Sequence, residues 1–168
     1  MLTTQEQILK WAAYTLCALA LAFAFTLTLR EVELLGARMF LPPLIVAVVA
    51  SVEDTRSAAI FALAFGLLCD LTVSGTFPCV YTLAFTIAAL GASLLAKSVL
   101  QPGILCSVLL TVLCFAVTDA LNMLALGISC RAPFVPMFSL AARETLLSLP
   151  LLAAVHPALV ALHKKFTI

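Results

Sequence analysis

Four ionisable side chains lie within segments that are otherwise apolar, and these are the residues of the chain best placed to do chemistry. They are Asp70, Asp119, Arg143 and Glu144. A charged side chain inside a transmembrane helix costs about 2.5–3.5 kcal/mol on insertion scales, so such residues are functional candidates by default. Counted along the expected helices at about 1.5 Å per residue, all four fall in the same half of a bilayer. We therefore predict an intramembrane polar layer in which Arg143 pairs with Asp119 or Asp70.

Asp70 also has a simpler interpretation. It lies just before a turn built from Thr, Ser, Gly and Pro at residues 71–78. A carboxylate in that place could bond nearby backbone N–H groups and touch water among the lipid headgroups. Of the two histidines, His156 is expected to be hydrogen-bonded in the core, and His163 is expected at the membrane interface.

Motifs of known catalytic sites are missing from the sequence. It contains no G-x-x-x-x-G-K-[ST], no H-E-x-x-H, no G-x-S-x-G and no Cys/His set with metal-ligand spacing. The six cysteines form no C-x-x-C pair, and small hydrophobic packing is the expected role of free thiols in apolar segments. We therefore expect a protein that is not an enzyme and that needs no cofactor and no metal.

The composition indicates which kind of fold holds these ionisable residues. The chain has 168 residues, of which 64% are hydrophobic and only 10% charged, and its mean hydropathy is +1.22. Soluble domains carry about 25% charged residues. An all-α polytopic membrane protein with a single domain is therefore predicted, with the lipid bilayer as its surroundings. The net charge of +1 gives no reason to expect a nucleic-acid partner.

The central feature is a hairpin of two apolar segments between Ser57 and Ala96, interrupted by the turn that follows Asp70. One segment, 39–52, is short for a span; it could recruit Leu34 and Leu35, or lie sheltered among the other helices. In total we expect a compact bundle of about six transmembrane helices, at residues 11–29, 39–52, 58–72, 79–96, 104–127 and 138–162.

The basic residues suggest an orientation, because cytoplasmic loops carry an excess of Lys and Arg. An even number of spans places both termini on one side, and the richer set of basic residues favours the cytoplasm for that side. Trp11 and Tyr14 are expected at the interface, and the turn from Glu53 to Arg56 is expected to be solvated. The basic residues on the predicted cytoplasmic side are Lys10, Arg56, Lys97, Lys164 and Lys165, against Arg30, Arg38 and Arg131 on the other, or four if Arg143 is included.

The stretch from Phe61 to Pro78, F-A-L-A-F-G-L-L-C-D-L-T-V-S-G-T-F-P, resembles the G-x-x-x-D-x-x-x-x-G core of the rod shape-determining protein family MreD. Gly66, Asp70 and Gly75 match this motif. The chain length, the Leu41-Pro42-Pro43-Leu44 segment, the acidic turn and the basic end of the last helix are also similar. The family commonly has a further glycine after the motif, where this chain has Phe77 and Pro78.

The resemblance implies a non-enzymatic scaffold subunit of the bacterial cell-elongation machinery, which builds peptidoglycan during rod-shaped growth. Such a subunit would sit in the cytoplasmic membrane and bind the membrane-anchored protein MreC. Through MreC it would work with RodA, an elongation-specific penicillin-binding protein and the filament protein MreB.

A second class of function also fits the hairpin-rich pattern. The fold expected for this family is similar to that of the vitamin-binding subunits of energy-coupling-factor transporters. In those subunits small residues four apart on the first helix dock a coupling protein, and Ala18 with Ala22 or Ala20 with Ala24 would serve. The outer loops expected here, 71–78 and 129–137, carry few of the polar and aromatic groups that a vitamin site needs.

Overall fold

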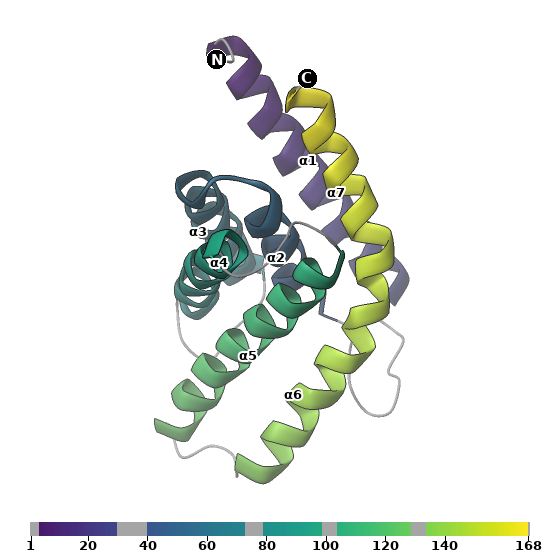
Figure 1. Ribbon diagram of the computed structural model, residues 1–168. Coiled ribbons are helices and arrows are strands. Elements are labelled where there is room, and N and C mark those ends of the chain that lie inside the picture. Colours follow the sequence, from purple (N-terminus) through teal and green to yellow (C-terminus); the bar gives the residue numbers. More distant parts are fainter. Residues whose placement is uncertain (1–3, 30–39, 73–78, 99–103, 129–133, 168) are drawn as a thin grey trace.

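The computed structural model describes residues 4–29, 40–72, 79–98, 104–128 and 134–167. Within these residues every regular element is a helix, as the composition predicts (Figure 1). Each of the six expected apolar segments is helical. The elements are α1 (Thr4–Leu29), α2 (Pro42–Val52), α3 (Thr55–Thr72), α4 (Val80–Ser98), α5 (Ile104–Ile128), α6 (Phe134–Ser148), the 3₁₀ turn η1 (Leu149–Leu151) and α7 (Leu152–Thr167).

Three helical stretches are long and apolar enough to cross a membrane: Thr55–Thr72, Ile104–Gly127 and Pro136–His163. Only 22–39% of each is buried inside the protein. Large apolar side chains therefore face outward, with Leu71 81% exposed and Leu105 76% exposed. A water-soluble domain avoids large contiguous apolar patches of this kind, so the exposed faces indicate a membrane protein.

Helix α2 is the centre of the packing. Every residue from Pro43 to Ala50 is buried, and α2 packs against α3, α4, α5 and α7. Pro42 and Pro43 occupy its first turn, where their missing N–H groups cost no hydrogen bond. Of the two interpretations of segment 39–52, the structure supports a short helix sheltered among the others.

Helices α3 and α4 form the expected hairpin, and this is the most extensive pairing of helices in the described chain. A glycine allows their close approach. A Cβ atom added at Gly66 would lie 2.6 Å from the Thr82 Cα and 2.9 Å from the Tyr81 carbonyl oxygen. Those atoms belong to the backbone of α4 and cannot move aside as a flexible side chain would.

The last expected span, 138–162, is not one continuous helix. It is divided into α6 and α7 by the 3₁₀ turn η1, which contains Pro150. Proline has no N–H to donate and its ring clashes with the preceding turn, so the α-helix is interrupted there. The buried hydroxyl of Ser148, at the end of α6, accepts a hydrogen bond of 3.2 Å from the backbone N–H of Phe40.

Helix α1 starts at Thr4, seven residues before the expected start of the first span at residue 11. Its first half lies beside the end of α7, so that the two chain ends lie at the same end of the molecule (Figure 1). The first and the last helix of the chain are therefore packed against each other.

We predict that Gly66→Ala destabilises the protein by about 1–3 kcal/mol, the usual cost of forcing an extra methyl group into a packed interior. The matched control is Gly91→Ala in α4, where an added Cβ would meet only the Leu113 Cδ2 atom at 3.9 Å. Alanine has the higher helix propensity, so the control is expected to be neutral or stabilising. Thermal unfolding in detergent micelles measures both, and equal stability of the two variants would contradict the prediction.

Candidate functional site

The carboxylate of Asp70, near the end of α3, caps the start of α4. Asp70 Oδ1 accepts a hydrogen bond of 3.0 Å from the N–H of Tyr81, and Oδ2 accepts one of 2.8 Å from the N–H of Thr82. The Thr82 hydroxyl also donates to Oδ2. The first N–H groups of a helix have no partner inside it and are commonly satisfied by a nearby acidic side chain. The expectation that Asp70 bonds nearby backbone N–H groups is therefore confirmed, and its contact with headgroup water stays a prediction.

Gly66 and Asp70 act together because they are four residues apart and so lie on the same face of α3. The glycine brings the backbone of α3 against Tyr81 and Thr82, and the aspartate bonds the N–H groups of these same two residues. Cys79, the residue before α4, has a positive φ of 65°, which turns the chain into the helix. Gly75, the third motif residue, lies outside the described residues.

Electrostatic interactions connect three of the four predicted polar-layer residues. The Glu144 carboxyl group interacts with that of Asp119. Tyr81 interacts with Asp70 and Glu144 and forms a side-chain hydrogen bond with Asn122. The remaining member, Arg143, is exposed on α6, and its pairing with Asp119 or Asp70 stays a prediction.

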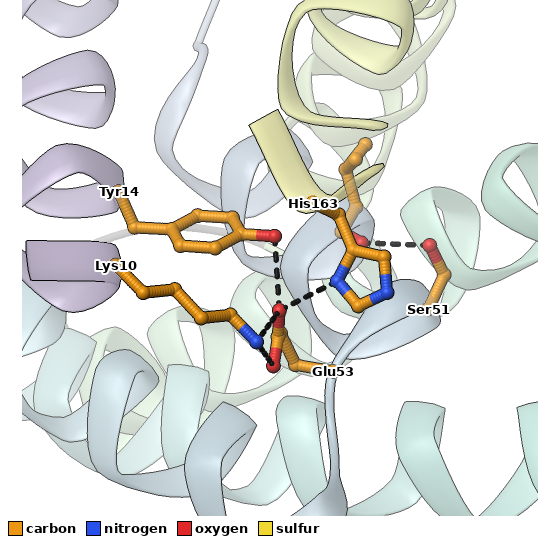
Figure 2. A network of polar contacts seen from close by, with 6 residues as sticks. Lys10, Tyr14, Ser51, Glu53 and His163 are labelled. Atoms are coloured by element: carbon orange, nitrogen blue, oxygen red, sulfur yellow. Dashed lines mark hydrogen bonds and ion pairs between the residues drawn. The ribbon is translucent and has the colours of Figure 1, made fainter. Parts of the chain in front are cut away.

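A second polar group, which we call the Glu53 cluster, consists of Lys10, Tyr14, Glu53 and His163 (Figure 2). The ammonium of Lys10 lies 2.8 Å from both carboxylate oxygens of Glu53. The Tyr14 hydroxyl donates to Oε1 at 2.9 Å, and Nδ1 of His163 lies 2.7 Å from the same oxygen. Since an ionised carboxylate only accepts, His163 carries a proton on Nδ1. The cluster joins α1, the turn after α2, and α7.

Burial and hydrogen bonding act on Glu53 in opposite directions. The side chain is only 6% exposed, and this loss of water by itself would raise its pKa. The hydrogen bonds from Lys10, His163 and Tyr14 favour the ionised form and together outweigh it, so the pKa of Glu53 lies below its usual value. Glu53 is therefore a buried anion at neutral pH, with donors on both oxygens.

One expectation for these residues is wrong, because Glu53 is buried rather than solvated. Tyr14 is fully buried against the protein and His163 contacts Glu53, while their place at the membrane interface stays a prediction. Asp54 and Arg56, in the same turn, are exposed as expected. The predicted topology could have indicated this cluster, because it places Lys10, Glu53 and His163 at the same membrane surface.

His156 belongs to a third polar contact, two helical turns before His163 on α7. Its Nδ1 lies 3.0 Å from the buried Ser107 hydroxyl of α5. The Ser107 oxygen is 3.3 Å from that of Ser51, near the end of α2, and Ser51 donates to the carbonyl of Val48. His156 is thus a hydrogen-bonded residue that links three helices, as expected from the sequence.

These contacts define what the sites can do chemically. Glu53 and Asp70 each bind donors from neighbouring helices, which fixes the position of those helices. Within the described parts of the chain, no group of three or more His, Cys, Asp and Glu side chains is arranged to hold a metal ion.

We predict that Asp70→Ala lowers the free energy of unfolding by about 1–3 kcal/mol, because it leaves partly buried N–H donors of α4 without their acceptor. Asp70→Asn keeps one acceptor oxygen and is expected to lose less. Asp119→Asn is the control, because Asp119 takes no part in the cap. Denaturation in detergent measures all three variants; a loss for Asp119→Asn as large as for Asp70→Ala would favour the polar layer over the cap.

Comparison of this chain with models of known protein families, with curated proteins and with solved structures gives no match.

Proposed function

We propose that this protein is a non-enzymatic membrane scaffold subunit of the bacterial cell-elongation machinery, resembling MreD and binding an MreC-like membrane-anchored protein. The main observation behind the proposal is the structural role of two motif residues. Gly66 and Asp70 contact the backbone of α4. This supports a motif that builds a helical hairpin, as a scaffold requires, rather than one that recognises a small ligand.

The exposed apolar faces are the second support. A partner with a single transmembrane helix would reach this protein through the membrane plane, where association depends on close packing and interhelical hydrogen bonds. Small residues four apart are already used inside the bundle, with Ala62, Gly66, Ala88 and Ala92 all buried. The surfaces left for a partner are those of the outward-facing helices.

The topology belongs to the same proposal. Six spans would place both termini in the cytoplasm, and the two chain ends do lie at the same end of the molecule (Figure 1). RodA, an elongation-specific penicillin-binding protein and MreB are proposed as indirect partners through the MreC-like protein. The protein would lie in the cytoplasmic membrane.

Copurification tests the proposal directly. The tagged chain is co-expressed with the MreC-like protein of the same genome, solubilised in mild detergent and captured. We expect the MreC-like protein to be retained, and retention to be lost when its transmembrane helix is replaced by an unrelated one. Capture of a vitamin together with a coupling protein and an ATPase, without any elongation protein, would favour the transporter subunit instead.

A further inference from the structure

Helix α1 is attached to the rest of the protein along one face. Among its described side chains only Lys10, Tyr14 and Ala18 are fully buried, and their spacing of four places them on that face. Trp11, Cys17, Leu21 and Ala22 are partly buried and pack against the core beside them. Large apolar residues on its other faces are exposed, including Leu16 at 73% and Phe23 at 67%. The main packing partner of α1 is α7.

In a bilayer, the contacts along this face decide whether α1 stays attached to the rest of the protein. Lipid tails are as apolar as leucine, so a helix in a bilayer gains no hydrophobic stabilisation by packing on its neighbours. Partly buried side chains of α1, among them Trp11 and Leu21, still add van der Waals packing against the core. The bonds from Lys10 and Tyr14 to Glu53 add the charged contact that holds α1 in one position. The ammonium of Lys10, whose side chain is only 11% exposed, needs that carboxylate, because an uncompensated buried charge is strongly destabilising.

We propose that α1 is a detachable helix, held in place by the negative charge of Glu53 and released when that charge is removed, while the bundle around α2 stays folded. The groups facing Glu53 are Lys10 and Tyr14 from α1 and His163 from α7. Asp54 follows it in the turn and Arg56 lies in the first turn of α3, and both are exposed.

The direction of the pH effect follows from Glu53. A carboxylate whose pKa is lowered on folding stabilises the folded state above its unfolded pKa, and this contribution is lost as the pH falls through the folded pKa. The pKa of Glu53 lies below its ordinary value of 4.5. Helix α1 is therefore attached at neutral pH and is released only in strong acid, which makes acid an experimental means of opening the contact.

The chain contains its own reporter for this event. Trp11 is the one tryptophan of the sequence, and its ring centroid lies 5.6 Å from that of Tyr14 and 6.4 Å from that of Phe61 in α3. Release of α1 would separate Trp11 from Phe61 and turn its ring toward lipid. Cys114 of α5, which is fully buried, reports separately on the bundle.

The test compares Glu53→Gln with the exposed neighbour Asp54→Asn, both in vesicles of phosphatidylcholine containing a brominated analogue that quenches tryptophan. At neutral pH we expect quenching of Trp11 in Glu53→Gln to rise about twofold or more over wild type, because the released helix meets lipid on every face. Asp54→Asn should match wild type. Wild type itself should reach the value of Glu53→Gln only below pH 4.5.

Modification of Cys114 by a maleimide, followed by peptide mass spectrometry, separates release from unfolding. We expect it to stay slow in Glu53→Gln. Equal Trp11 quenching in Glu53→Gln and wild type would overturn the proposal. So would a Cys114 that becomes reactive in step with Trp11, because α1 would then leave only when the whole protein unfolds. Both readouts are independent of any elongation partner.

Discussion

The hydrogen bonds between the Asp70 carboxylate and the first N–H groups of α4 fix the packing of α3 against α4, and the rest of the helical arrangement depends on this pair. In hydrocarbon an unsatisfied N–H costs several kcal/mol, so the start of α4 needs an acceptor wherever it lies below the membrane surface. Asp70 supplies that acceptor from another helix, and Gly66 brings it within reach. One residue pair thus sets both the closeness and the register of α3 and α4, and these helices enclose one side of α2.

Glu53 provides the same kind of solution at another place in the molecule. There a single carboxylate gathers donors from the two terminal helices, α1 and α7 (Figure 2). In both places an acid that is costly in an apolar setting is stabilised by groups that would themselves be costly alone. Polar contacts of this kind can specify which helices are neighbours, which exposed leucine faces cannot do.

The sequence was sufficient to predict the helical fold and the hairpin, because apolar segments and turn residues are local signals. It also offered the capping interpretation of Asp70, since the aspartate precedes a turn and its partners, Tyr81 and Thr82, lie only 11 and 12 residues away. The Glu53 cluster could not be found in this way. Its bonds join residues 43, 39 and 110 positions apart, and no local pattern records such distances.

The interruption between α6 and α7 shows a different limit. Hydropathy is continuous from Pro136 to His163, so composition alone favours one span, whereas Pro150 changes the backbone without changing the hydropathy. For Arg143 the helix is predictable but the partner is not. Its helix fixes only its approximate depth, and the choice between Asp119 and Asp70 depends on side-chain geometry.

The burial of α2 has a consequence for how the chain is assembled. A helix of 11 residues is about 16 Å long, roughly half the thickness of the hydrocarbon core, and its contacts are with protein on all sides. It is too short to cross the core on its own, and the N–H of Phe40 just before it finds its acceptor in Ser148, far along the chain. Helix α2 therefore reaches its final environment only after α7 has been synthesised.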